Sequence, residues 1–497
     1  MKTHNLISIL FLGLLAATAH AGPADDVLLP VADDPTVSYR IMFFAGSQYD
    51  PPGKEGLAAL TARMIVEAST KQHSYEEILD LLFPMAGGYE ASCSVETVVI
   101  SGRIHKDYVA AFQPLLLQAI VEPAFDEEEL KRIRSDMISY LENTLRYSSD
   151  EDLGKAVLYE TMFAGTPYGH IPAGRVKSLK SITIDDVRAF YRRNFTKLNY
   201  VLGLGGGYGI ESLNSLKEGL KKLPPYQIGA RPHLDTKPIN GLQVTIVEKD
   251  APATAISIGA RLDVLRGQSD WYSLALANSW FGEHRNSASH LYQVIREVRG
   301  LNYGDYSYIE HFANGGALDF PAPNDPRRQQ IFEMWIRPVP HAWGHFALRA
   351  ALRELKHLID DGLTEEQVLE KRAALSKYVF HFAPTTMDRL GYAMDDKFYH
   401  IEGSHLEHYR KVMPGMTRNR VHEAVRKHLQ YKDLQIVIIT KDAKALREAL
   451  VSDAPSQITY PTPRPAEVLK EDEEIINFPL HIQPENVHII SGKSLFE

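Results

Sequence analysis

Cysteine is nearly absent from this sequence, and so is any excess of basic residues. The 497 residues include one cysteine, Cys93, which excludes an intramolecular disulfide framework and any zinc site built from several cysteines. The 54 Lys and Arg residues are outnumbered by 63 Asp and Glu residues, and the formal net charge is −9. Proteins that bind nucleic acid or an anionic membrane through charge need a basic surface, so the composition favours neither class.

Long apolar runs are also missing, and the short one near the start has the features of an export signal. Lys2 supplies a positive charge, residues 6–17 form the apolar run, and residues 19–21 form a small-x-small cleavage site. The run is too short to cross a membrane as a helix, and position 22 holds glycine rather than the cysteine of a lipid anchor. We predict a cleavable signal peptide over residues 1–21 and a periplasmic chain, with secretion or an outer-face location as the alternative.

The rest of the chain has an ordinary globular composition and divides into two halves with the same order of elements. Strands are expected at 39–44, 95–104 and 200–204, and again at 242–248, 255–260 and 434–440. Helical periodicity occupies 56–68, 75–82, 108–121 and 127–145 in the first half, and 271–281, 290–298, 346–360 and 365–376 in the second. Thr183 and Asp186 form a helix N-cap signature before 187–193. This repeated order indicates an α+β fold that arose by duplication.

A Pro-rich, polar stretch without periodicity separates the halves. It runs over residues 223–241, and we place the domain linker there. The prediction is therefore an N-terminal domain over 30–222, a C-terminal domain over 242–455 and an irregular tail over 456–497.

Several short segments occur in a characteristic order along almost the whole mature chain. They are residues 45–47 with Asp50, 56–58, 87–88, Pro123 with Phe125, Arg132 with Arg134, 167–169, Gly174, 190–191, 295–297 and 300–303. In this order they resemble the insulinase/pitrilysin group of inverted-motif zinc metalloproteases, nearest the mitochondrial-processing-peptidase type and its bacterial relatives. The resemblance implies two homologous α/β-sandwich domains, each a sheet packed on helices, that together form half of a clamshell.

The zinc site that the resemblance would bring is degenerate. The family places H-x-x-E-H on one helix, where two histidines bind zinc and the glutamate activates the metal-bound water. Here the corresponding positions hold Ala59, Ala62 and Arg63, and the position of the third ligand falls near Tyr140. The family's asparagine after the double glycine is replaced by Ala91. Alanine cannot ligate zinc and arginine repels it, so we carry over no catalytic or metal-binding residue and expect no cofactor in this chain.

One element of the family's site is retained in the second half. Active members use an arginine and a tyrosine seven positions apart, and Arg296 and Tyr303 have this spacing. The guanidinium and the phenol hydroxyl are both donors suited to a substrate carbonyl or its developing oxyanion. We expect Arg296 on a helix and Tyr303 on the following strand. In two-subunit members the zinc-less chain supplies this pair, so the resemblance implies that Arg296 and Tyr303 are substrate-binding residues.

Other motifs give weaker signals. His341 and His345 have helical ligand spacing but no evident third ligand, and His400, His405 and His408 are interpreted as a solvated loop cluster. The segment that begins with His422-Glu423 breaks the H-E-x-x-H pattern, and the glycine run 203–209 lacks the last glycine of a nucleotide-binding loop, so we interpret it as a turn after a strand. The pairs 327–328 and 371–372 are interpreted as isolated surface charges.

These observations lead to three hypotheses of different kinds. The first is a non-catalytic subunit of a periplasmic zinc metalloendopeptidase heterodimer, not an enzyme on its own. Its partner would be a zinc-bearing paralogous peptidase subunit and its substrate a peptide or unfolded polypeptide, with no nucleic acid and no membrane anchor. The second is a structural or peptide-binding assembly module with no role in proteolysis. The third is an active metallopeptidase with a non-family metal site around His341 and His345.

Overall fold

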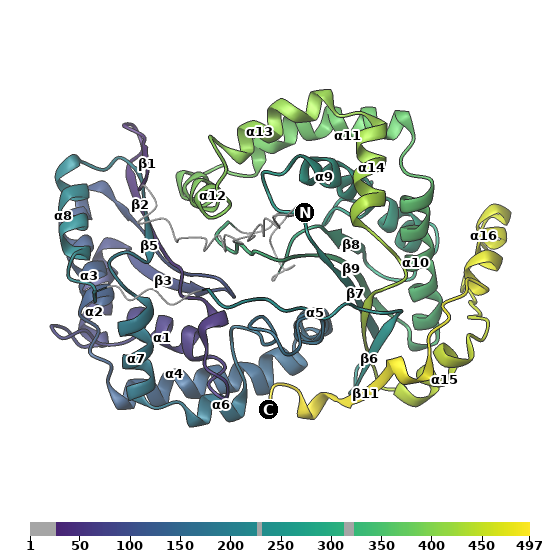
Figure 1. Ribbon diagram of the computed structural model, residues 1–497, viewed down its shortest axis with the longest axis horizontal. Coiled ribbons are helices and arrows are strands. Elements are labelled where there is room, and N and C mark those ends of the chain that lie inside the picture. The colour runs from purple at the N-terminus through teal and green to yellow at the C-terminus, as the bar shows by residue number, and fades with distance from the viewer. Residues whose placement is uncertain (1–25, 226–230, 313–322) are drawn as a thin grey trace, which may run out of the picture.

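The computed structural model describes residues 26–225, 231–312 and 323–497 and contains two β-sheets, each packed against helices (Figure 1). The predicted signal peptide, residues 1–21, lies outside the described residues, as do residues 226–230 of the predicted linker. The described remainder of that linker, residues 223–225 and 231–241, contains no helix or strand. The first sheet has five strands and the second has six.

The first sheet is built from the first half of the chain. Its strands are β1 (Val27–Pro30), β2 (Thr36–Phe43), β3 (Gly88–Cys93), β4 (Val98–His105) and β5 (Tyr200–Gly206). The helices are α1 (Leu57–Val66), α2 (Tyr75–Leu82), α3 (Val109–Val121), α4 (Glu127–Ser139), α5 (Asp150–Met162), α6 (Val176–Ser181), α7 (Ile184–Asn194) and α8 (Ile210–Leu220). Thr183 and Asp186 form the capping box of α7, which confirms the predicted helix start.

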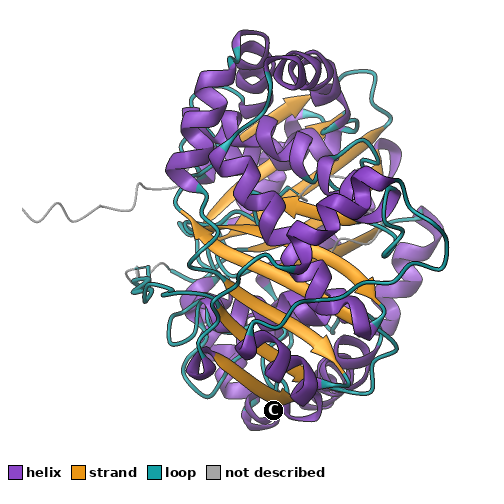
Figure 2. Cartoon of the chain, turned by 90° about the vertical axis from the view of Figure 1, so that its right-hand side faces the viewer, coloured by secondary structure: helices purple, strands orange, loops and turns teal. Residues whose placement is uncertain are grey.

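The second sheet is covered by helices in the same way, as the side view in Figure 2 shows. Its strands are β6 (Gln243–Glu248), β7 (Thr254–Leu262), β8 (Asp305–Tyr308), β9 (Gln330–Val339), β10 (Gln435–Thr440) and β11 (Val487–Ser491). The helices are α9 (Ser269–Phe281), α10 (Gly344–Asp360), α11 (Glu365–Tyr378), α12 (Thr386–Phe398), α13 (His405–Val412), α14 (Arg418–His428), α15 (Ala443–Ser452) and α16 (Ala466–Ile476).

The two sheets repeat one topology. The strand order is β1-β5-β2-β4-β3 in the first sheet and β11-β6-β10-β7-β9-β8 in the second. When β11 is set aside, every position in one order has its counterpart in the other. In both sheets the first of these pairs is parallel and the following three are antiparallel. This correspondence supports the predicted duplication and makes α9, which follows β7, the counterpart of α1, which follows β2.

Two helices cross from one half to the other. The helix α5 packs on β7 and β10 of the second sheet, and α12 packs on β5, β1 and β2 of the first. Glycines make room for them, because a Cβ at Gly203 would lie 2.5 Å from the sulfur of Met394 and a Cβ at Gly259 would lie 2.8 Å from the terminal methyl of Met162. Each half therefore completes its core with a helix from the other half.

The prediction that the glycine run 203–209 is a turn after the strand is only partly right. Gly203 and Gly205 lie within β5, where they face residues of α12. Gly206, the last residue of the strand, has a φ of +95°, and a Cβ there would lie 2.1 Å from the carbonyl oxygen of Thr36. The first glycines of the run therefore serve helix packing, and the turn begins only at Gly206.

The predicted irregular tail over residues 456–497 is a wrong prediction. This segment forms α16, which packs on α10, and β11, which pairs in parallel with β6. Beyond β11 the chain returns to the first half, where Phe496 is buried in the core around the first sheet. In the sequence, the apolar residues of this segment occur in short groups after a Pro-rich stretch. Their spacing therefore shows neither the period of a helix nor that of a strand.

The fold is α+β, with two mixed sheets packed on helices, as predicted. Within the described ranges no helix is long and apolar enough to cross a membrane. Three features hold the first and second halves together: the packing of a shared core, the helices α5 and α12, and the segment beyond β11.

Candidate functional site

Arg296 lies at the end of a π-helical turn on the second half. The turn spans Tyr292–Glu297, and such turns are frequent at functional sites. The Arg296 guanidinium forms an ion pair with Glu297 and lies 5.3 Å from the centre of the Tyr292 ring. The side chain of Arg296 is 36% exposed, so its remaining donors reach solvent.

Tyr303 is presented to solvent by a tightly held loop. The residues before it, Leu301 and Asn302, are buried, whereas Tyr303 is 79% exposed. The side-chain amide of Asn302 donates to the carboxylate of Asp305 at 2.7 Å and to the backbone carbonyl of Arg337 at 3.0 Å. These two hydrogen bonds fix the position of the loop. The prediction that Tyr303 lies on the strand is wrong, because β8 begins at Asp305. The structure thus gives two exposed donors, the guanidinium on a helical turn and the phenol on the loop that follows it.

The degenerate zinc positions lie on α1, and Arg63 faces α4. Ala62 is buried, and Arg63 binds Glu67 through Nε at 2.9 Å and approaches Asp136 of α4 at 3.6 Å. Although burial acts in the opposite direction, these two carboxylates raise the pKa of Arg63, so it stays charged. Arg63 therefore links α1 to α4.

The position of the third family ligand also has no acidic residue. Tyr140 opens a π-helical turn, Tyr140–Leu145, directly after α4, and its side chain is 44% exposed. Across the described ranges of the chain, no group of three or more His, Cys, Asp or Glu side chains could hold a metal ion.

Two of the segments that carry the family resemblance hold α1 in place, although the zinc-ligand positions on this helix are lost. The side chain of Asp50 is fully buried, and its carboxylate accepts hydrogen bonds from the backbone amides of Gly56 and Ala58, both at 2.7 Å. His170 lies 3.1 Å from the same carboxylate. Burial raises the pKa of Asp50, and the bond to His170 opposes this. Gly174 must be glycine, because a Cβ there would lie 2.2 Å from the carbonyl oxygen of Glu55.

The histidine pair of the third hypothesis is not arranged for metal binding. The ring nitrogens of His341 are engaged by the hydroxyls of Thr254 and Thr440, at 2.9 and 3.1 Å, and by the carbonyl of Ala251 at 3.1 Å. His345 is buried, and burial lowers its pKa to about 4. Both residues are therefore structural, and the geometry gives this hypothesis no support.

Three groups that we interpreted as surface residues are buried or bridge the two halves. His405 is 1% exposed and lies among aromatic rings at the start of α13. Lys371 is also buried. Arg328 reaches from the second half to Glu96 at 2.7 Å and Gln48 at 2.6 Å in the first. Sequence reasoning missed these residues because isolated charges carry no local signal of the long-range contacts that bury them.

The strand β3 forms one edge of the first sheet. It pairs with β4 on one side and is the last strand in the sheet order. Its side chains alternate between exposed and partly buried, beginning with the exposed Gly88. The outer edge of β3 therefore offers backbone groups outside the sheet's own ladder, close to α1, which contacts this strand.

Two family models match the chain in adjacent segments. The model described as insulinase (peptidase family M16) matches residues 27–173, and the one described as the peptidase M16 inactive domain matches residues 181–375. Together they cover more than half of the 497 residues.

Curated relatives are distant but share long segments. The chain is 26% identical over 317 residues to the non-peptidase homolog YmxG of Helicobacter pylori, which covers 61% of this chain and 72% of that protein. It is also 26% identical over 272 residues to an uncharacterized zinc protease of Mycobacterium bovis, covering 52% of this chain and 53% of that protein. The chain thus spans about half the length of the mycobacterial relative.

Solved structures share the fold. The peptidase M16 inactive domain from Pseudomonas fluorescens matches with a TM-score of 0.73 at 20% identity, over 84% of this chain and 96% of that one. The periplasmic protease PqqL of Escherichia coli matches with a TM-score of 0.66 at 16% identity, over 90% of this chain but 48% of that one. Its first half alone gives a TM-score of 0.64 at 15% identity, over 92% of this chain and 98% of that one.

The chain therefore has the architecture of one half of a PqqL-like clamshell. Its repeated topology, its ordered motifs and both family models agree, and the chain belongs to the insulinase (M16) family of peptidases.

Proposed function

We propose that this chain is the zinc-less, non-catalytic subunit of a periplasmic zinc metalloendopeptidase heterodimer, in which Arg296 and Tyr303 bind the peptide. The observation that carries the proposal is the match to half of a longer protease. The chain aligns with 98% of the first half of PqqL and with 48% of the whole. A separate partner chain would then supply the other half of the clamshell.

The partner would provide the metal and the water-activating base. In this chain Ala59, Ala62 and Arg63 occupy the positions of two zinc ligands and the water-activating glutamate of active members, and the position of the third ligand falls near Tyr140. A catalytic zinc site needs three protein ligands and an open position for water. The partner is therefore expected to be a paralogous peptidase subunit with an intact H-x-x-E-H motif.

Arg296 and Tyr303 have the chemistry of carbonyl-binding donors. The Arg296 guanidinium is engaged by Glu297 but remains 36% exposed, and an exposed ion pair contributes only about 0–1 kcal/mol. A peptide carbonyl can therefore take a donor from it at low cost. The hydroxyl of Tyr303, which is 79% exposed, needs no rearrangement before it donates.

The edge of β3 gives the proposal a second binding element. An extended peptide can add to an unpaired sheet edge through backbone hydrogen bonds, which bind without demanding one side-chain sequence. Residues 88–93 supply such an edge next to α1. This mode suits a peptide or unfolded-polypeptide substrate.

The first test uses the mature chain alone and then the assembled pair. We expect no stoichiometric zinc by elemental analysis and no peptide hydrolysis by the chain alone. In the pair reconstituted with a peptidase that has an intact motif, Arg296→Ala should lower kcat/KM by at least about ten-fold, as the loss of an oxyanion donor does. Tyr303→Phe should lower it as well, because the hydroxyl is the donor.

The matched control is Arg420→Ala, which removes an exposed arginine from α14. Its kcat/KM should equal that of the unmodified pair. Zinc-dependent cleavage by the chain alone, or full activity of the Arg296→Ala pair, would contradict the proposal.

The alternative is a structural or peptide-binding assembly module with no role in proteolysis. One observation favours it, which is that the Helicobacter pylori relative is named a non-peptidase homolog. If the chain assembles with partner proteins but both variants leave peptide cleavage unchanged, the module hypothesis replaces the heterodimer.

A further inference from the structure

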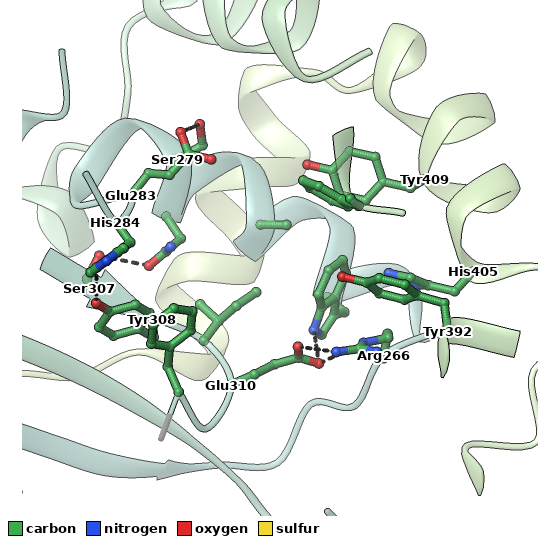
Figure 3. Close-up of a pocket in the computed structure, with 16 residues that line it drawn as sticks. Arg266, Ser279, Glu283, His284, Ser307, Tyr308, Glu310, Tyr392, His405 and Tyr409 are labelled. Atoms are coloured by element: carbon green, nitrogen blue, oxygen red, sulfur yellow. Dashed lines mark hydrogen bonds and ion pairs between the residues drawn. The ribbon is translucent and has the colours of Figure 1, made fainter. Parts of the chain in front are cut away.

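A cavity of about 100 Å³ lies in the second half, beside α9, α12 and α13 and the segment that follows β8 (Figure 3). Its walls are strongly aromatic. The rings that line it are those of Trp271, Tyr308, Phe312, Phe382, Tyr392 and Tyr409. The cavity is distinct from the exposed Arg296 and Tyr303, neither of which lines it.

The one arginine in the lining is already paired with two carboxylates of the protein. Arg266 donates through Nε and Nη2 to the two oxygens of Glu310, at 3.2 and 2.8 Å. Its Nη1 donates to Asp395 at 3.1 Å. The indole N–H of Trp271 is also used, because it donates to Glu310 at 3.1 Å. The strong donors of the lining are therefore already bound to carboxylates of the protein.

A second carboxylate in the lining is held by neutral donors. Glu283 follows α9 and accepts hydrogen bonds from the Ser279 hydroxyl at 3.1 Å and the Asn286 amide at 2.7 Å. Figure 3 shows Glu283 on the side of the cavity that faces Tyr409. A carboxylate held in this way remains an acceptor for a cation.

The lining contains two carboxylates, Glu283 and Glu310, and one guanidinium, Arg266, while Lys155 lies behind the rings of Tyr308 and Phe312. Burial raises the pKa of Glu283, and the hydrogen bonds from Asn286 and Ser279 and the charge of Lys371 oppose this shift. Burial holds the pKa of His405 well below its usual value, so this ring adds no positive charge. Arg285, next to the lining, is exposed to solvent, which screens its charge.

We propose that this cavity binds a small organic ammonium group, with the Glu283 carboxylate as counter-ion and the rings of Trp271 and Tyr409 as cation–π partners. The rings of Tyr308 and Phe312 already lie against Lys155, and that of Tyr392 lies against Arg266. Aromatic rings together with a carboxylate attract an ammonium group, because the faces of the rings carry negative electrostatic potential. An anionic ligand is disfavoured, since the charge of Arg266 is already paired with the carboxylates of Glu310 and Asp395 and the indole N–H of Trp271 is bound to Glu310. The site goes beyond the proposed function and does not depend on a partner chain.

The experiment is a ligand-observed NMR titration of the full chain with n-butylammonium at pH 7, with 1-butanol as the neutral probe of the same shape. We expect saturable binding of n-butylammonium at about millimolar concentration, and 1-butanol binding at least about ten-fold more weakly. Glu283→Gln keeps acceptor capacity for Ser279 and Asn286 but removes the charge. It should weaken n-butylammonium binding about ten-fold, which equals about 1.4 kcal/mol.

Glu423→Gln is the control, since it removes the same charge from an exposed position on α14. Thermal unfolding of both variants without ligand shows that they fold. The proposal is overturned if n-butylammonium and 1-butanol bind equally, if neither binds, or if Glu283→Gln binds as tightly as the unmodified chain.

Discussion

Phe496 offers a sharp test of how the two halves are joined. It follows β11 of the second sheet, yet its ring is 1% exposed in the core around the first sheet. Its carbonyl accepts a hydrogen bond from the amide of Val176 at 2.8 Å, and Arg146 binds the neighbouring carbonyl of Leu495 through Nε at 2.9 Å. Phe496→Ala deletes the ring but keeps these backbone bonds, so it isolates the packing contribution.

The expected loss of unfolding free energy is about 3 kcal/mol. Replacing a buried phenylalanine by alanine costs about 3–5 kcal/mol through lost transfer free energy and the cavity left behind. We expect the lower end, because the segment beyond β11 is short and can relax toward the space that the ring leaves. Phe83→Ala is the matched control, since Phe83 is 86% exposed and should change the free energy by less than about 0.5 kcal/mol.

Urea unfolding followed by two probes gives the measurement. Far-ultraviolet circular dichroism reports both halves, whereas the tryptophans, Trp271, Trp280, Trp335 and Trp343, all lie in the second half. Because α5 and α12 are exchanged between the halves, we expect Phe496→Ala to shift both transitions together. The reasoning is refuted if Phe496→Ala is as stable as Phe83→Ala, or if the tryptophan transition stays in place while the circular dichroism transition moves.

Three further predictions concern buried charges. The ammonium of Lys155 is buried 3.9 Å from the buried carboxylate of Glu333. Burial lowers the pKa of Lys155 from 10.5 to about 7, so above pH 7 the unfolded chain binds more protons and stability should rise toward pH 10. The double variant Lys155→Met/Glu333→Gln, which removes both charges, should flatten this rise in urea unfolding curves. Arg328→Gln leaves the buried Glu96 without its cation and should cost about 3 kcal/mol, measured by urea unfolding, whereas an unchanged midpoint would show that the contact between halves contributes nothing. Asp50→Ala leaves two backbone amides of the α1 start unpaired and should cost about 2–4 kcal/mol in the same assay, with Asp50→Asn between it and the unmodified chain.

Elements with strong local signals were predicted well. The helix α2 spans Tyr75–Leu82, the predicted range, because its capping box and apolar spacing lie within a few residues of each other. The capping box at Thr183 is equally local. In contrast, β1 and β3 were missed, because a short strand depends on the neighbour that pairs with it. The tail was missed for the same reason, since β11 exists through its pairing with β6.

The candidate site was predicted only in its residue types. The spacing of Arg296 and Tyr303 and the loss of the ligands at Ala59, Ala62 and Arg63 are properties of the linear chain. The exposure of Tyr303 depends on a buried Asn302 that is pinned by Asp305 and by a carbonyl of β9. No local pattern shows such a contact.

The sequence by itself determined the family, the duplicated order of elements and the absence of a family zinc site, because each depends on which residues occur and in what order. Only the tertiary structure decided that α5 and α12 exchange between the halves, that Arg328 bridges them, and that aromatic rings and Glu283 meet around one cavity. The physical reason is that helix capping and amphipathic spacing act over a few residues. Burial, pairing of strands and the pKa of a buried charge are set by neighbours that lie far away along the chain.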